Sequence, residues 1–162
     1  MAEEVIYRPI GVIHSPFKTP KGTPIQPKSV KGVKGKVIVK EEYKEGLKNL
    51  DGFSHIILIY HFHLSQGYSL VVIPYMDDSP HGVFATRAPK RPNPIGLSVV
   101  KLLSIRDNIL EVEDVDIVDG TPLLDIKPYV SDFDVRKVEK IGWLEKVIHK
   151  LPEKRDDGRF LS

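Results

Sequence analysis

The residues best suited to binding a charged ligand lie in a proline-rich stretch, residues 80–96. This stretch carries Arg87, Lys90 and Arg91 with no acidic residue between them. Proline holds φ near a single value, so the segment is expected to form a stiff loop. The guanidinium fork of Arg87 matches the geometry of a carboxylate or a phosphate, and a loop-fixing salt bridge is the structural alternative. The stretch predicts a rigid binding loop or, equally, a proline-stiffened loop of a heat-resistant protein.

A second candidate site is a cluster of aspartates, Asp116, Asp119 and Asp125, within ten positions of each other. Asp119-Gly120 is a strong turn signal, and Asp119 is able to cap amide groups of its own loop. For any single aspartate this structural role is at least as plausible as catalysis. Together the three carboxylates indicate an electronegative pocket, which would attract a cation.

Three histidines, His55, His61 and His63, share one face of a predicted strand. Two histidines at positions i and i+2 can bind zinc, with Asp77 or Asp78 completing the site. We prefer the alternative that they are hydrogen-bonding groups in a polar pocket inside a barrel, because no His-Glu-x-x-His spacing is present. We therefore expect no metal.

Two common nucleotide-binding patterns are missing. No Gly-x-Gly-x-x-Gly follows a predicted strand, so a Rossmann cofactor site is not supported. Residues 32–36 combine glycine and lysine, but their spacing differs from that of a P-loop, and Val37 stands where a Ser or Thr is required.

Alternating and β-branched residues predict strands in most of the chain before residue 119. Residues 54–64 are the strongest, and both of their faces avoid charge, so this strand should be central and buried on each side. Many strands and few helices favour an antiparallel barrel or sandwich. The expected strands cover residues 5–15, 37–40, 54–64, 68–75, 82–86, 95–105 and 109–118.

The end of the chain differs from the rest. Apolar residues from Val138 to Leu151 recur at helical spacing with Lys and Glu between them, which predicts an amphipathic helix stopped by Pro152. We expect a mainly β barrel domain over residues 1–135, with a C-terminal helix and polar tail over residues 136–162.

Composition sets broad limits. The 162 residues suit one domain with a single core, and the net charge of +2 says little about partners. The absence of cysteine excludes disulfides and thiolate chemistry. No apolar run has the length of a membrane span, so a cytoplasmic protein without membrane contact is expected. Lysines crowd residues 18–40, where they could meet phosphates or form a solvated surface.

Several sequence blocks together resemble the TsaA-like, or TrmO, family. They occur in the family's order and cover residues 5–131. The resemblance implies an all-β methyltransferase that works as a homodimer. It further implies that S-adenosylmethionine is the methyl donor and that the acceptor is N6 of threonylcarbamoyladenosine, next to the anticodon of certain tRNAs. The blocks are residues 10–16, 53–55, 82–87, 91–96, 116–122 and 125–129.

The resemblance also assigns site residues. It implies that Gln26 and Pro27 lie over the cofactor, and it places His63 near it. The residue after His63 is often polar in the family, whereas Leu64 allows only a backbone or apolar contact. Leu97 would pack against adenine, with a core position as the alternative. The remaining cofactor contacts are expected from Arg87, Asp116, Asp119, Gly120 and Thr121, and substrate contacts from Lys90, Arg91 and Asn93.

The expected acceptor nitrogen is part of a urea, so its lone pair is delocalised and a base that removes its proton would help. We expect Asp119 to be this base, with His63 as the second candidate. Two other functions remain open. A non-catalytic barrel could bind nucleotides or RNA through its lysines and aromatic side chains, or His55, His61 and His63 could hold a metal for a hydrolase.

Overall fold

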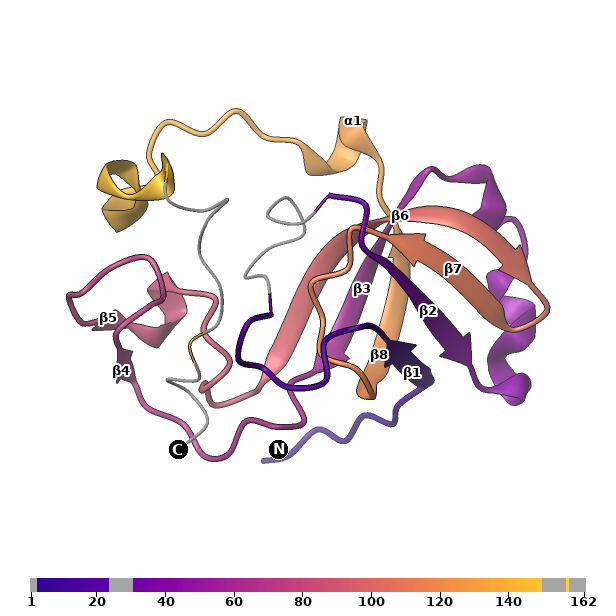
Figure 1. Cartoon of the computed structure of the whole chain (residues 1–162), viewed down its shortest axis with the longest axis horizontal. Coiled ribbons are helices and arrows are strands. Elements are labelled where there is room, and N and C mark those ends of the chain that lie inside the picture. The colour runs from indigo at the N-terminus through magenta and orange to yellow at the C-terminus, as the bar shows by residue number, and fades with distance from the viewer. Residues whose placement is uncertain (1–2, 24–30, 150–156, 158–162) are drawn as a thin grey trace.

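Six antiparallel strands form a closed barrel, which confirms the expected fold class (Figure 1). The structure is a computed structural model that describes residues 3–23, 31–149 and 157. Around the barrel the strands follow the order β1-β2-β7-β6-β3-β8, and β8 closes it by pairing with both β1 and β3. Their bounds are β1 Gly11–His14, β2 Lys34–Val39, β3 His55–His61, β6 Ile95–Arg106, β7 Ile109–Glu113 and β8 Thr121–Pro128.

Strand β3 is central, between β6 and β8, as predicted, but only one of its faces is buried. Ile56, Leu58 and Tyr60 point into the barrel core, whereas the side chains at odd positions are half-buried on its outside. The prediction of two buried faces was therefore wrong. A small closed barrel has one apolar interior, so a strand without charges need not be covered on both sides.

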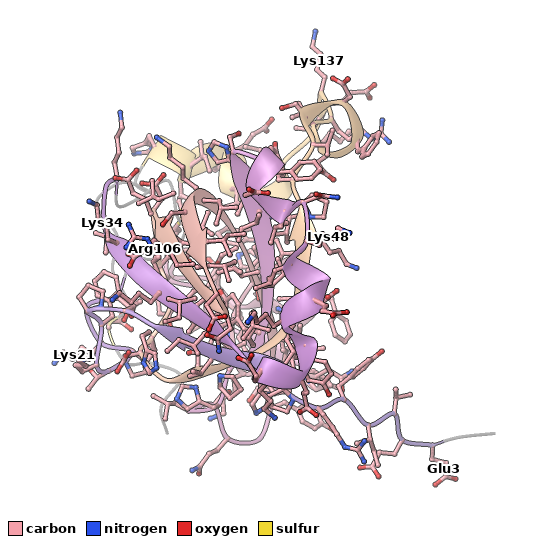
Figure 2. All side chains as sticks on the ribbon, turned by 90° about the vertical axis from the view of Figure 1, so that its right-hand side faces the viewer. Glu3, Lys21, Lys34, Lys48, Arg106 and Lys137 are labelled. Atoms are coloured by element: carbon pink, nitrogen blue, oxygen red, sulfur yellow. The ribbon has the colours of Figure 1, made fainter. Side chains whose placement is uncertain are left out.

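The strand limits differ from the expected ones in several places. Of the expected strand over 68–75 only Val71–Val72 is formed, residues 83–85 of the expected 82–86 strand are a 3-10 helix, and the 109–118 strand ends at Glu113. The sequence from 116 to 125 suggested a turn, yet residues from Thr121 onward form β8 and complete the barrel. At the N-terminus, only Gly11–His14 of the expected 5–15 strand is a strand, and Ile10 before it is hydrogen-bonded to Leu123 and Lys40. The preceding residues form an extended arm, and Figure 2 shows Glu3 at its far end, well away from the barrel.

Two short strands and a 3-10 helix form an excursion beside the barrel. They are β4 (Val71–Val72), β5 (His81–Gly82) and η4 (Val83–Ala85). Buried Val72, Val83 and Ala88 form a small core of their own there. In Figure 1 this excursion lies to the left of the barrel, with the C-terminal segment above it. Two further 3-10 helices follow β2, namely η2 (Glu41–Leu47) and η3 (Leu50–Gly52).

The long C-terminal helix is not formed in the described residues. The segment contains a single helical turn, α1 (Ser131–Asp134), and a 3-10 helix, η5 (Gly142–Lys146). Gly142 has φ of +60°, a left-handed conformation that an α-helix cannot contain. The expected helix over 138–151 was therefore wrong as far as His149, where the described part of the segment stops. In the described parts of the chain, no helix has the length and apolar character needed to cross a membrane.

Gly96 on β6 leaves room for an aromatic ring. A Cβ at this position would lie 2.3 Å from Cε2 of Tyr60 and 2.8 Å from Cζ of Phe62. Tyr60 is buried and packs edge-on against Phe62 at a centroid distance of 5.5 Å, so neither ring is free to move aside. The glycine of the 91–96 block is therefore required by packing.

We expect Gly96→Ala to lower the free energy of unfolding by roughly 1–3 kcal/mol, the usual cost of overpacking a core. Gly46→Ala is the matched control, because nothing lies within 4 Å of its added Cβ. Urea unfolding of both variants checks the prediction. Equal stability of the two would show that the rings relax without cost.

Candidate active site

One pocket of about 1300 Å³ lies where the barrel, the β4–β5 excursion and the C-terminal segment meet. The barrel contributes the start of β6 and the segment between β7 and β8, including Leu97 and Asp116. The excursion contributes the loop around Arg87, and the C-terminal segment contributes Trp143 and Leu144. Three parts of the chain that are distant in sequence therefore surround one space, which is large enough for a ligand of nucleoside size and a second group beside it.

The loop that carries Arg87 is fixed by its own polar groups. The Thr86 hydroxyl donates to the Val83 carbonyl at 2.8 Å and accepts the Ala88 N–H at 3.2 Å. Nη1 of Arg91 donates to the carbonyls of Thr86 and Ala88 at 3.0 and 3.1 Å. Arg91 therefore braces the loop as well as lining the pocket. Arg87 is exposed, so its guanidinium is presented from a rigid backbone.

Asp116 is the buried acid of the pocket. Its Oδ1 accepts the Ser98 hydroxyl at 2.7 Å, and the Ser98 oxygen lies 2.8 Å from the hydroxyl of Tyr60. Burial raises the pKa of the Asp116 carboxyl to about 7, against the opposing effects of the Ser98 hydrogen bond and the charge of Arg87. A carboxyl that is half-ionised near neutral pH is unusual, and such groups concentrate at functional sites.

Asp119 lies outside this pocket lining and joins two loops. Its carboxylate accepts the Ser15 N–H at 3.0 Å and the Lys18 ammonium at 2.9 Å, and it lies 3.0 Å from Nδ1 of His14. The Lys18 contact and the Ser15 amide are the main reasons that its pKa is lowered to about 2. These contacts match the turn-fixing role that the sequence left open, and a carboxylate of this acidity is a weak base.

Asp119→Asn is expected to remove a contribution to folding stability that the wild type has at neutral pH and loses in acid. Since the pKa is lowered in the folded state, the contribution is present above pH 4 and lost as the pH falls toward 2. We expect a loss of at most about 1 kcal/mol at pH 7, because the group is partly solvated. Unfolding curves at pH 3 and pH 7 measure it, and an equal effect at both would contradict the assignment.

His63 and its neighbour Leu64 both line the pocket. Burial, and then the neighbouring His61, lower the pKa of His63 below its ordinary value, so the imidazole is neutral at pH 7. His55 and His61 lie on the outer face of β3 and not inside the barrel, because the inward positions of this strand are the even ones. Within the described ranges, no three His, Asp or Glu side chains gather closely enough to hold a metal ion.

The other residues expected at the site divide into three groups. Asn93, Leu97 and Thr121 line the pocket, and Thr121 is buried with its hydroxyl donated to the Val118 carbonyl at 2.6 Å. Lys90 and Gly120 are not among the lining residues. Gln26 and Pro27 lie outside the described residues.

The C-terminal wall of the pocket was not anticipated. Nε1 of Trp143 donates to the Ala85 carbonyl at 2.8 Å, and its ring stacks on His81 at a centroid distance of 4.8 Å. His81 is held in turn by Asp77 at 2.7 Å. Trp143 therefore attaches the C-terminal segment to the loop of Arg87. The lone tryptophan was the available signal, since its indole N–H requires an acceptor when it is covered.

The side chains of the pocket fit S-adenosylmethionine by their chemistry. Arg87 suits the carboxylate of the methionine part, and Asp116 suits positive charge. Leu97 and Phe84 offer apolar surface to a flat base. One pocket thus combines an acid, a cation and apolar walls, which matches a ligand that carries both charges and an adenine ring.

The fold and the pocket together define a β-barrel protein that binds a small ligand with charged and apolar parts. The chain belongs to the TrmO family, because the family model described as tRNA-methyltransferase O N-terminal domain matches residues 12–135.

Three relatives illustrate the similarity. A "Probable S-adenosyl-L-methionine-binding protein" of Pyrococcus abyssi is 63% identical over 98% of this chain and 86% of its own length. The tRNA (adenine(37)-N6)-methyltransferase of Escherichia coli is 39% identical over 76% of this chain and 57% of its length. The crystal structure of TrmO from Pseudomonas aeruginosa superimposes with a TM-score of 0.72 at 34% identity, covering 86% of this chain. The chain spans 62% of that TrmO structure.

Proposed function

We propose that this protein methylates N6 of threonylcarbamoyladenosine next to the tRNA anticodon, with S-adenosylmethionine as methyl donor. One observation carries the proposal: five of the six sequence blocks on which the family resemblance rests contribute residues to a single pocket. Residues from the 82–87, 91–96 and 116–122 blocks all line it. The E. coli relative bears the name of such a methyltransferase, and the P. abyssi relative that of a cofactor-binding protein. These names favour methyl transfer over an RNA-binding module or a metal hydrolase.

When bound, the donor supplies a methyl group on a positively charged sulfur. The chain's own residues bind it, orient it and exclude water. Arg87 holds the carboxylate end, Leu97 contacts the base, and His63 with Leu64 closes the neighbouring wall. Holding the two reactants in line can by itself supply roughly 7–11 kcal/mol of barrier lowering. Positioning is therefore the main catalytic effect that we assign to the pocket as a whole.

Contacts to tRNA are assigned to cations near the pocket. Lys21 lies between Pro20 and Thr23, which both line it, and Lys90, Arg91 and Asn93 border or line it on the loop side. Figure 2 shows Lys21 and Lys34 on one side of the molecule, with Lys48 on the opposite side. This side suits the phosphate backbone, so binding should weaken as salt rises. A tRNA substrate also supports the cytoplasmic location expected from the sequence.

We further propose that the protein is a homodimer. Large apolar side chains of the excursion beside the pocket are exposed, with Leu70 and Val71 both at 61%. Exposed apolar side chains gathered at one site are typical of an interface. Sedimentation as a species of twice the chain mass supports the dimer, and sedimentation as a monomer at micromolar concentration refutes it.

Calorimetric titration with S-adenosylmethionine tests the binding part of the proposal. Saturable heat at micromolar ligand, with a rise in melting temperature, is the expected result. No heat and no thermal shift would overturn it and would favour the RNA-binding module.

A further inference from the structure

A hydrogen-bonded network of three buried side chains, two with hydroxyl groups and one with a carboxyl group, connects the barrel core to the pocket. Tyr60 on β3, Ser98 on β6 and Asp116 after β7 are 6%, 1% and 8% exposed. Ser98 lies within hydrogen-bond distance of both of the others, at 2.8 and 2.7 Å. Burying three polar groups in a barrel of this size is costly unless each has a partner, and here each has one.

The direction of the hydrogen bonds follows from the number of protons. Ser98 has a single hydroxyl proton and donates it to Oδ1 of Asp116. The hydroxyl of Tyr60 must therefore be the donor to the Ser98 oxygen. Both protons point toward Asp116, and donors aligned in this way strengthen one another. This network holds the carboxyl of Asp116 from its buried side, while Asp116 also lines the pocket.

We propose that Asp116 is the base that accepts the proton of the acceptor nitrogen, and that Ser98 and Tyr60 are positioning residues that hold its carboxyl at the pocket wall. The inference rests on the proposed function. In this step the N–H bond of the acceptor breaks and its proton passes to a carboxylate oxygen of Asp116. The nitrogen electron pair forms the bond to the methyl carbon. The carbon–sulfur bond breaks, and its electrons remain on sulfur, which becomes neutral.

Two other carboxylates near the site, those of Asp114 and Asp119, form hydrogen bonds to groups outside the pocket. The carboxylate of Asp119 is held by Lys18 and the Ser15 amide, and Asp114 accepts the Gly32 N–H at 2.7 Å. Asp116 has a pKa of about 7, which suits a base at neutral pH. The positive charge of Arg87, on the loop of the excursion, favours the ionised form of Asp116 and lowers its pKa. The titratable and charged groups that line the pocket are His55, Tyr60, His63, Tyr75, Arg87, Arg91, Asp114, Asp116 and Tyr129.

Steady-state kinetics of Asp116→Asn give the first test, because asparagine can still accept the Ser98 hydrogen bond. We expect cofactor affinity to stay within about tenfold while kcat falls by roughly 10²- to 10⁴-fold, the usual contribution of a general base. Asp107→Asn, on the turn between β6 and β7, is the matched control. A kcat within tenfold of wild type would overturn the assignment, and His63→Gln then tests the other base.

The pH profile tests the positioning residues. Ser98 lowers the pKa of Asp116 through its hydrogen bond, so Ser98→Ala should move the acid limb of kcat to higher pH. Ser104→Ala on the same strand should leave the limb in place. An unmoved limb in Ser98→Ala would contradict the positioning role. This readout remains valid if Asp116→Asn does not fold.

Proton release provides a measurement that does not depend on turnover. Positive charge brought beside Asp116 favours its carboxylate, so titration with S-adenosylmethionine at pH 7 should release part of a proton. Calorimetry in two buffers of different ionisation enthalpy measures this release, which should vanish in Asp116→Asn. Cofactor binding by wild type without proton release would count against Asp116 alone. Failure of the wild type to bind the cofactor would instead overturn the proposed function.

Discussion

Replacing Arg87 with alanine is expected to weaken S-adenosylmethionine binding by roughly 10- to 100-fold. A hydrogen bond to a charged partner contributes about 1.5–3 kcal/mol, and the guanidinium is the group on the 83–91 loop that we assign to the cofactor carboxylate. The loop itself should persist, because it is held by Thr86 and by the bonds from Arg91 to two carbonyls. The loss should therefore appear in affinity and not in melting temperature.

Two variants make the Arg87 result specific. Arg87→Lys keeps the charge without the planar fork, so it should recover only part of the affinity. Arg106→Ala, at the far end of β6, should bind as wild type does. Unchanged cofactor affinity in Arg87→Ala, with a raised KM for tRNA, would move Arg87 from the cofactor to the substrate.

The second large effect concerns Asp116 and the pH dependence of stability. The pKa of this carboxyl is about 7 in the folded protein and near 3.8 when unfolded. Folding therefore favours the protonated form, and the free energy of unfolding should fall as the pH rises from about 4 to about 7. Three pKa units correspond to about 4 kcal/mol. Above pH 8 the folded protein carries the full cost of an ionised buried carboxyl.

Asp116→Asn should abolish this fall. Relative to wild type, the variant should gain about 4 kcal/mol between pH 4 and pH 8, as measured by urea unfolding at several pH values. Other groups, including His63, titrate in both proteins and cancel in the difference. Asp107→Asn should show no such change between pH 4 and pH 8, because the hydrogen bond from Lys44 lowers the pKa of Asp107 and confines its effect to more acidic pH. A difference between Asp116→Asn and wild type that does not vary with pH would mean that Asp116 is ionised in the folded state throughout this range.

The barrel was predictable because its core strands carry strong local signals. The predicted strands over 54–64 and 95–105 lie close to the observed β3 and β6, which span His55–His61 and Ile95–Arg106. β8 was missed for two reasons. The Asp119-Gly120 pair directly before it predicts a turn, and Pro122 is unfavourable within a strand. The C-terminal helix was overpredicted because periodicity alone ignores the left-handed conformation of Gly142.

The site was less predictable than the fold. The sequence presents three aspartates within ten positions, and nothing in it separates Asp116, which is buried, from Asp119, which is held by Lys18. That distinction depends on contacts between residues about 100 positions apart. The sequence contains one local signal for the hydrogen-bonded network of Tyr60, Ser98 and Asp116. Ser98 interrupts the otherwise apolar inward positions of β6, and a lone hydroxyl on an apolar face requires a partner.

Transfer of a labelled methyl group from S-adenosylmethionine to tRNA tests the central claim most directly. The purified protein would be given two preparations of one tRNA, with and without threonylcarbamoyladenosine next to the anticodon. We predict label on the modified nucleoside only, identified by mass spectrometry after digestion. Cofactor binding without label in either tRNA, or label on another nucleoside, would contradict the proposed reaction.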